Sequence, residues 1–128
     1  MKILLDTCAF LWLISDAPQL SSAARAQFSD PENDICLSAV STWEIALKHA
    51  LGKLPLPEPP ERFVPEQREK HRIGSLTLAE QATFHLYRLP GLHRDPFDRM
   101  LVCQAIELGL VILTPDPLIT QYPVRTLW

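Results

Sequence analysis

Two aspartates stand three residues apart in the stretch HRDPFDRML, His93 to Leu101, immediately before a strongly apolar run. Asp95 suits the N-cap of a helix that has Pro96 as its first residue, because proline is well tolerated at that position. Asp95 also precedes Arg99 by four residues, in the favourable acid-before-base order. Asp98 has no comparable local role, so it is the better candidate for chemistry.

Three further acids, Asp6, Glu44 and Asp116, lie beside short apolar segments elsewhere in the chain. Each has a structural alternative. Asp6 is a favoured N-cap for a following helix, Glu44 completes an S-x-x-E capping box with Ser41, and Asp116 belongs to the turn-forming sequence TPDP. Taken one at a time, these acids are explained as well by structure as by function.

The interpretation changes if these carboxylates meet at one edge of the fold. Like charges within a few ångströms raise one another's pKa, and such a cluster requires a counter-ion. Carboxylate oxygens favour Mg²⁺ or Mn²⁺ over zinc, and either ion can activate water for phosphodiester hydrolysis. This chemistry needs no catalytic His, Ser or Cys, and of the four histidines only His93 lies near the expected site.

Short apolar strands that alternate with amphipathic helices are expected to position these acids. The strands are expected at residues 2–5, 35–38, 73–76, 110–113 and 124–128, and the helices at 21–29, 41–51, 77–89 and 95–108. The proline-rich segment Leu54 to Pro65 is expected to be irregular, with at most short turns. The alternation predicts an α/β fold with a mainly parallel sheet covered on both faces. Ligands of such sheets bind beyond the carboxyl ends of the strands, which is where the acids fall.

The composition of the chain is typical of a soluble globular protein: 128 residues with 47% apolar and 21% charged residues. The run Thr7 to Ser15 is too short for a membrane span, and Asp6 interrupts any secretory signal. Three widely spaced cysteines form no disulfide or zinc pattern. We therefore expect Cys8, Cys36 and Cys103 to be buried free thiols in a reducing cytoplasm.

The net charge of −3 argues weakly against a general nucleic-acid binder. Without the four candidate acids, however, the 15 acidic residues fall to 11, against 12 Lys and Arg. A site neutralised by divalent cations would then lie on a surface that does not repel phosphate. Candidate phosphate contacts are Lys48, Lys53, Arg94 and Arg99, although such residues more often lie on solvated helix faces.

Several blocks of the sequence resemble the PIN-domain nucleases, specifically the VapC-type toxins of toxin–antitoxin pairs. The resemblance covers nearly the whole chain, and the order and spacing of the blocks make it specific. It implies a single PIN domain over residues 1–128 with a three-layer α/β/α fold. The blocks are ILLDT (3–7), SAVSTWEIALKHALGKL (38–54), HRDPFDRMLVCQA (93–105), VILTPD (111–116) and the ending YPVRTLW.

Carried over position by position, the resemblance implies an acidic quartet that holds Mg²⁺ or Mn²⁺, with Asp95 close by; the quartet is Asp6, Glu44, Asp98 and Asp116. It also implies an RNA-cutting ribonuclease, a VapB-like antitoxin that blocks the cleft, and a homodimer. The chain departs from the family pattern at Pro117 to Thr120, which adds no acid beyond the last aspartate, and at Cys8, where many relatives have Ser or Asn. Thr7 and Thr114 stand next to these acids in the sequence or close to them. We expect them either to hydrogen-bond the carboxylates or to act as exposed helix caps.

Two other α/β families require residues that this sequence lacks. A phosphoacceptor receiver domain needs an acidic pair after the first strand and a Lys after the last, and the sequence has neither. A haloacid-dehalogenase-like phosphatase needs D-x-D, where this chain has Cys8. A degenerate PIN domain that binds RNA or an antitoxin without cleavage stays open. Trp12 and Trp43 are expected in the core or at an interface, and the proline-rich segment is a possible docking place for a partner.

Overall fold

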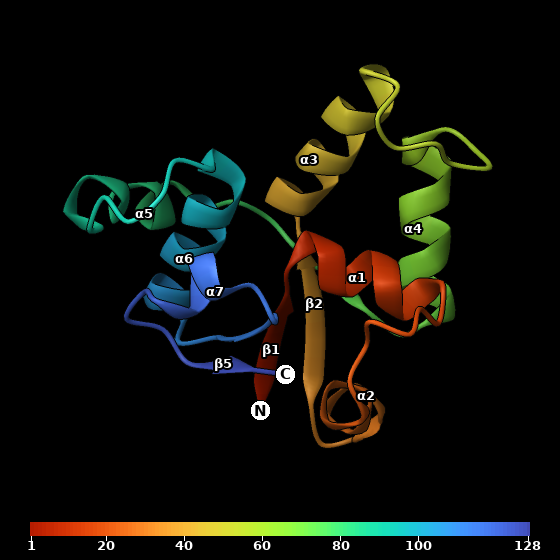
Figure 1. Ribbon diagram of the computed structural model, residues 1–128, viewed down its shortest axis with the longest axis horizontal. Helices are drawn as coiled ribbons and strands as arrows, with labels where there is room; N and C mark the ends of the chain where they lie inside the picture. Colours follow the sequence, from red (N-terminus) through yellow and green to blue (C-terminus); the bar gives the residue numbers. More distant parts are fainter.

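A computed structural model describes residues 1–128 and has a central sheet with helices packed on both faces (Figure 1). The strands are β1 Lys2–Leu5, β2 Asp34–Ser38, β3 Gly74–Leu76, β4 Val111–Leu113 and β5 Thr126–Leu127. The helices are α1 Thr7–Ile14, α2 Ser22–Ser29, α3 Ala39–Ala50, α4 Pro60–Lys70, α5 Glu80–Thr83, the 3₁₀ turn η1 Leu86–Arg88, α6 Pro96–Leu108 and α7 Pro117–Thr120. The predicted α/β class is confirmed.

The five strands lie in the order β3-β2-β1-β4-β5, and every neighbouring pair is parallel. The sheet is thus wholly parallel, where the sequence predicted a mainly parallel one. Strand β1 is central, with Ile3 paired to Ile35 of β2 on one side and to Val111 of β4 on the other. Residues that follow β1, β2 and β4 therefore emerge side by side at one edge of the sheet.

Side chains of the central strand alternate between two apolar cores, as the pleat of a strand requires. Ile3 and Leu5 pack with Phe10 of α1 on one face. Leu4 packs with Leu101 of α6 on the other face. All five of these side chains are fully buried, so both faces of the sheet are covered.

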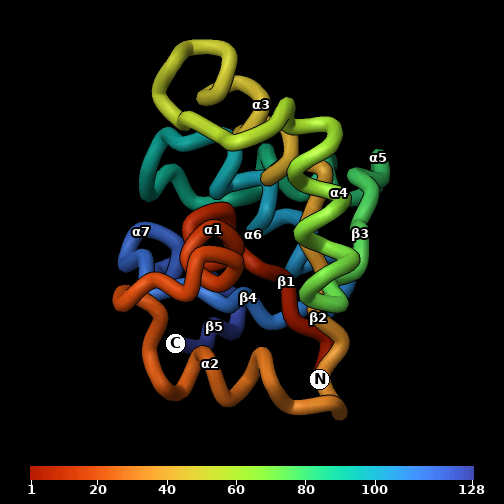
Figure 2. Tube along the Cα trace, turned by 90° about the vertical axis from the view of Figure 1, so that its right-hand side faces the viewer, coloured from red at the N-terminus to blue at the C-terminus, as the bar shows by residue number.

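The helices form a layer on each side of the sheet. Helices α1, α2 and α4 lie on one side, and α5, α6 and α7 lie on the other, as Figures 1 and 2 show. Helix α3 extends beyond the carboxyl end of β2, and it contributes Ile45 to the first core and Val40 to the second. Its Glu44 is thereby carried toward the edge where β1 and β4 end.

Several helices differ from the sequence-based expectation, including α7, which replaces the turn expected around Asp116. Helix α3 begins at Ala39 with Ser38 as its N-cap, so the predicted cap Ser41 lies inside the helix. The proline-rich segment enters a real helix, α4, because Pro60 suits the first helical position and the buried Val64 anchors the helix to the core. The expected helix at 77–89 is reduced to α5 and η1, where only Ala82 is buried and little packing supports a longer helix.

Helix α6 begins and ends as predicted, with Asp95 as its N-cap and Gly109 just after its last residue at φ 65°. It is the longest helix, with 13 residues, and none of the helices is long and apolar enough to cross a membrane. The three cysteines are free, but only Cys103 is buried; Cys36 is half-buried and Cys8 is exposed. The prediction of burial was therefore wrong for Cys8, which is exposed although its neighbours Thr7 and Ala9 in the first turn of α1 are buried.

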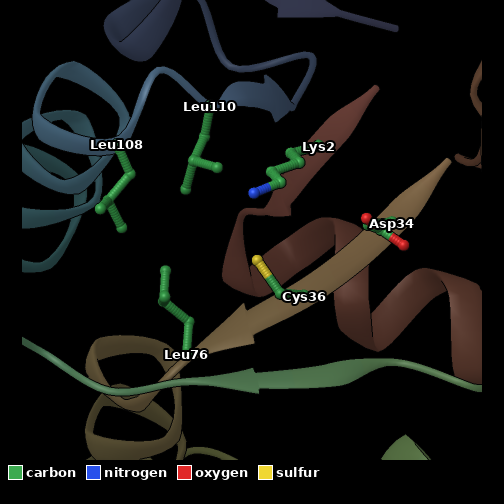
Figure 3. A pocket seen from close by; sticks show the side chains of 6 residues that line it. All are labelled: Lys2, Asp34, Cys36, Leu76, Leu108 and Leu110. Atoms are coloured by element: carbon green, nitrogen blue, oxygen red, sulfur yellow. The ribbon is translucent and has the colours of Figure 1, made fainter.

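An apolar cavity lies away from the candidate acids. Figure 3 shows this cavity of about 310 Å³, which is lined by Lys2, Asp34, Cys36, Leu76, Leu108 and Leu110. Lys2 and Asp34 begin their strands, whereas the acids follow the ends of theirs. The cavity and the acids are therefore separate features.

Candidate functional site

Asp6 leaves the central strand and becomes the N-cap of α1. Its carboxylate accepts hydrogen bonds from the backbone N–H of Ala9 at 2.5 Å and from the Thr114 hydroxyl. The residue is 4% exposed. The structural alternative and the functional one thus coexist at this position, since a cap contact fixes the carboxylate at the carboxyl end of β1.

Glu44 lies in the second turn of α3 and points back toward the start of α1. Its Oε1 accepts a hydrogen bond from the Thr7 hydroxyl at 2.7 Å, and its Oε2 forms an ion pair with Lys48. Thr7 Oγ1 also lies 3.0 Å from the hydroxyl oxygen of Ser41. The predicted capping box was therefore wrong: Ser41 and Glu44 are buried in the helix and face the site.

Asp95 and Asp98 occupy the first turn of α6 in different roles. Asp95 Oδ1 accepts from the backbone N–H groups of Phe97 at 2.9 Å and Asp98 at 3.1 Å, which confirms the predicted cap. Asp98 Oδ2 lies 3.2 Å from Nε2 of His93. The predicted Asp95–Arg99 pair is absent, because the guanidinium of Arg99 instead donates to Pro90 and Tyr122.

Asp116 follows β4 and caps the short helix α7, accepting from the N–H of Leu118 at 2.9 Å. Its own N–H donates to the Thr114 hydroxyl oxygen at 3.1 Å, and that hydroxyl in turn donates to Asp6. Thr114 thus ties the end of β4 to the end of β1. The sequence-based expectation that Thr7 and Thr114 hydrogen-bond the candidate carboxylates is confirmed.

The carboxylates interact electrostatically, although they come from four separate segments. Burial, followed by the negative charges of Asp116 and Glu44, raises the pKa of Asp6 to about 6, against the lowering effect of its hydrogen bonds from Thr114 and Ala9. Burial and the charge of Asp95, with further contributions from Asp116 and Glu44, raise the pKa of Asp98 to about 6. Each of these two acids therefore responds to charges on other elements of the site.

Positive charge partly compensates the cluster. The hydrogen bond from Lys48 to Glu44 raises the pKa of the ammonium group, and the charge of Asp95 raises it further. With the side chains in these positions, no three His, Cys, Asp or Glu residues form a group that could hold a metal ion. The oxygens of Asp6 and Glu44 are all occupied by protein donors, namely Ala9, Thr114, Thr7 and Lys48.

Cys8 lies close enough to the cluster to respond to its charges. Although the residue as a whole is exposed, partial desolvation of its sulfur, followed by the charges of Asp6 and Glu44, raises the pKa of the thiol to about 11. A thiol with so high a pKa is protonated at neutral pH and is a poor nucleophile. Covalent catalysis by Cys8 is therefore disfavoured, mainly by desolvation of the sulfur and further by the neighbouring carboxylates.

The donor chemistry of the site fits a hard divalent cation. All of its anionic atoms are carboxylate oxygens, the ligands that Mg²⁺ and Mn²⁺ prefer. Burial and, to a smaller extent, the neighbouring carboxylates destabilise the charged forms of Asp6 and Asp98, whose pKa values are raised to about 6. A bound cation would remove that penalty.

Sequence reasoning missed two features of the site. Ser41 was assigned to a cap, and Tyr122, which hydrogen-bonds His93 at 2.7 Å, was not considered at all. No local signal marks Tyr122, because it stands 29 residues after His93 and only the fold brings the two together. For Ser41, the hydroxyl-rich start of α3 offered several equivalent caps.

Comparison with known proteins gives consistent matches. The family model described as "PIN domain" matches residues 3–124. Ribonuclease VapC16 of Mycobacterium tuberculosis is 40% identical over 72 residues, which are 53% of this chain and 51% of that protein. The match thus spans about half the length of that curated relative.

Solved structures share the fold over nearly the whole chain. VapBC2 from Rickettsia felis, solved with a DNA fragment from its promoter, superposes with a TM-score of 0.75 at 16% identity. The match covers 100% of this chain and 99% of the Rickettsia felis chain. DNA-bound VapBC from Salmonella typhimurium superposes with a TM-score of 0.68 at 24% identity, covering 99% and 97%. At these identities the likeness shows the fold alone.

Proposed function

The chain belongs to the PIN domain family, and from this premise we propose that it is a metal-dependent endoribonuclease of the VapC kind. The observation that carries the proposal is the convergence of carboxylates from the ends of β1 and β4 and the starts of α3 and α6 at one edge of the sheet. Their mutual influence on the pKa values of Asp6 and Asp98 supports a shared site. The similarity to ribonuclease VapC16 supports RNA as the substrate class.

The residues proposed to hold Mg²⁺ or Mn²⁺ are Asp6, Glu44, Asp98 and Asp116, with Asp95 beside them. When bound, such an ion supplies an activated water molecule and stabilises charge on the phosphate. Asp95 has a smaller share in this proposal, because its Oδ1 is already used in capping α6.

The protein's own groups hold the carboxylates in place. Thr7 donates to Glu44 and Thr114 donates to Asp6, so each buried acid has a hydroxyl that fixes its orientation. Lys48 neutralises Glu44 and lies near Asp95, and we propose that its ammonium group moves from Glu44 to a substrate phosphate during the reaction cycle. A protonated Cys8 leaves water as the nucleophile.

We also propose that a VapB-like antitoxin and a second copy of the chain are partners. The solved structures with this fold include VapBC complexes, which supports the antitoxin.

Trp43 and Leu47 of α3 and Leu51 at its C-cap are exposed apolar side chains that an interface would cover. Light scattering of the isolated protein is expected to give twice the 14.5 kDa mass of one chain, and a monomeric mass would contradict the dimer.

One observation favours a second candidate, a degenerate PIN domain that binds RNA or an antitoxin without cutting. The ion pair between Lys48 and Glu44 gives the cluster an internal counter-charge, which makes a cation less necessary. In this alternative the fold and the acids persist as a scaffold for binding.

A cleavage assay separates the two functions. Purified protein, freed of any antitoxin, is incubated with total RNA in the presence of Mg²⁺ or Mn²⁺, and the variants Asp6→Asn and Asp98→Asn are assayed beside it. The enzyme proposal expects cation-dependent cutting that both substitutions abolish, with Asp34→Asn, an exposed acid on β2, as the matched control. Absence of cutting, together with RNA binding that is unchanged in Asp6→Asn and Asp98→Asn, would support the binding module instead.

A further inference from the structure

A partly buried series of hydrogen bonds leads from Arg99 through Tyr122 and His93 to Asp98. Arg99 Nη1 lies 2.9 Å from the hydroxyl oxygen of Tyr122, and that oxygen lies 2.7 Å from Nδ1 of His93. His93 Nε2 lies 3.2 Å from Asp98 Oδ2. Tyr122 is 3% exposed and the His93 side chain 8% exposed, so water has little access to these contacts.

The chemistry of arginine fixes which group donates and which accepts in each of these hydrogen bonds. A guanidinium group only donates, so the Tyr122 oxygen accepts from Arg99. The single hydrogen of the Tyr122 hydroxyl is then free to point at Nδ1 of His93, which acts as an acceptor. A neutral imidazole that accepts at Nδ1 carries its hydrogen on Nε2, and that hydrogen faces Asp98.

The arrangement treats the two oxygens of Asp98 differently. Oδ2 receives the ring N–H, whereas Oδ1 has no hydrogen bond within the protein. The backbone of Asp98 is held as well, since its N–H donates to the Asp95 cap. Arg99 further donates to the Pro90 carbonyl at 2.9 Å, which ties the loop that carries His93 to helix α6.

We propose that Arg99, Tyr122 and His93 form a positioning relay that locks the His93 tautomer and reserves one oxygen of Asp98 for the ring, leaving the other for a divalent cation. The inference rests on the proposed function, because it assigns the free oxygen to the metal. His93 acts through Asp98 and is a positioning residue. Outer contacts of this kind change metal affinity by roughly 10- to 100-fold when removed.

The first test examines the tautomer in the metal-free protein. Long-range ¹H–¹⁵N spectra of the histidine rings, recorded at slightly alkaline pH, are expected to show His93 with its hydrogen on Nε2. In Tyr122→Phe, Nδ1 of His93 no longer has a hydroxyl group that donates to it. Both neutral tautomers of His93 are then expected. A hydrogen on Nδ1 in the wild-type protein would overturn the relay.

The second test measures Mn²⁺ affinity by calorimetry. His93→Leu is expected to weaken binding about tenfold or more. His93→Gln, whose amide can restore a donor near Asp98, is expected to stay within about threefold of wild type. The matched control is His85→Leu, which removes a histidine with a carboxylate partner, Glu107, at the far end of α6. Its affinity is expected to equal that of wild type.

These outcomes keep the two proposals apart. Wild-type affinity in a folded His93→Leu protein would overturn the relay and leave the metal site standing. A wild-type protein that takes up no Mn²⁺ would contradict the proposed function, and with it the assignment of the free Asp98 oxygen. If His93→Leu fails to fold, Tyr122→Phe carries the affinity test, and unchanged Mn²⁺ binding in that variant would count against the relay.

Discussion

Asp6 illustrates how a single residue combines structural and functional demands. Its carboxylate caps α1 and also meets the charges of Asp116 and Glu44, and its pKa is raised to about 6. A carboxyl group with a raised pKa in the folded state stabilises the fold most at low pH, where it is protonated. That contribution is lost as the pH rises through about 6. The metal-free protein is therefore expected to lose stability between about pH 4 and pH 7.

Replacing Asp6 by Asn should remove much of this penalty. An amide can still accept from Ala9 and can donate to Thr114, but it carries no charge. Chemical denaturation in the presence of a chelator is expected to show Asp6→Asn more stable than wild type at neutral pH, by on the order of 1–3 kcal/mol. Asp34→Asn serves as the exposed control and should change little. An Asp6→Asn protein that is less stable than wild type at neutral pH would contradict the electrostatic argument.

Lys48 is the internal counter-charge of Glu44, whose side chain is 6% exposed. Lys48→Met keeps the length of the side chain and removes its charge, so the metal-free fold should lose on the order of 1–3 kcal/mol. Saturating Mn²⁺ should restore most of that loss, because a cation can take the place of the ammonium group. Thermal unfolding with and without Mn²⁺ measures both effects. If the ion gives Lys48→Met no larger stabilisation than it gives wild type, Glu44 does not contribute to the metal site.

The sequence was enough to identify these acids, but it did not reveal the residues that hydrogen-bond them. Asp98 was identified because it lacked a local role. The acids do lie close enough to influence one another's pKa, although no three of them are grouped closely enough to hold a metal ion as they stand. The contacts of Glu44 with Thr7 and of His93 with Tyr122 span 37 and 29 residues. Contacts of that range depend on how the helices pack, which no local pattern specifies.

At the scale of elements, the start of α6 carries two acids with different roles: Asp95 caps the helix, and Asp98 is a proposed metal ligand. Asp95→Ser should preserve the cap, because serine also accepts from the first backbone N–H groups. We expect this variant to lose less than about 1 kcal/mol of stability and to retain measurable cleavage. Asp98→Asn should keep the helix but lose cleavage. Equal loss of cleavage in both variants, measured on the same RNA, would require Asp95 to be a full member of the site.

The elements themselves were predictable to different degrees. Helix α6 was found with both ends because Asp95, Pro96 and Gly109 are strong boundary signals. Helix α4 was missed because prolines usually interrupt helices, whereas here Pro60 begins one and the burial of Val64 holds it. The region of α5 and η1 was overestimated, since an amphipathic pattern alone does not replace packing.

At the scale of the whole molecule, a wholly parallel sheet gathers the ends of β1, β2 and β4 at one edge. Alternation along β1 fills two cores and leaves Asp6 at the end of the central strand, where neighbouring segments converge. The fold thus brings acids from four parts of the chain within electrostatic reach of one another. This convergence was predictable from the βαβ pattern, whereas the internal ion pair and the histidine relay were not.

Binding of a divalent cation at this edge of the sheet is the central property of the proposed site. Calorimetric titration of the metal-free wild-type protein with Mn²⁺ at neutral pH is predicted to show uptake that Asp6→Asn and Asp98→Asn abolish and that Asp34→Asn leaves intact. A wild-type protein that takes up no Mn²⁺, or uptake that survives both site substitutions, would contradict it.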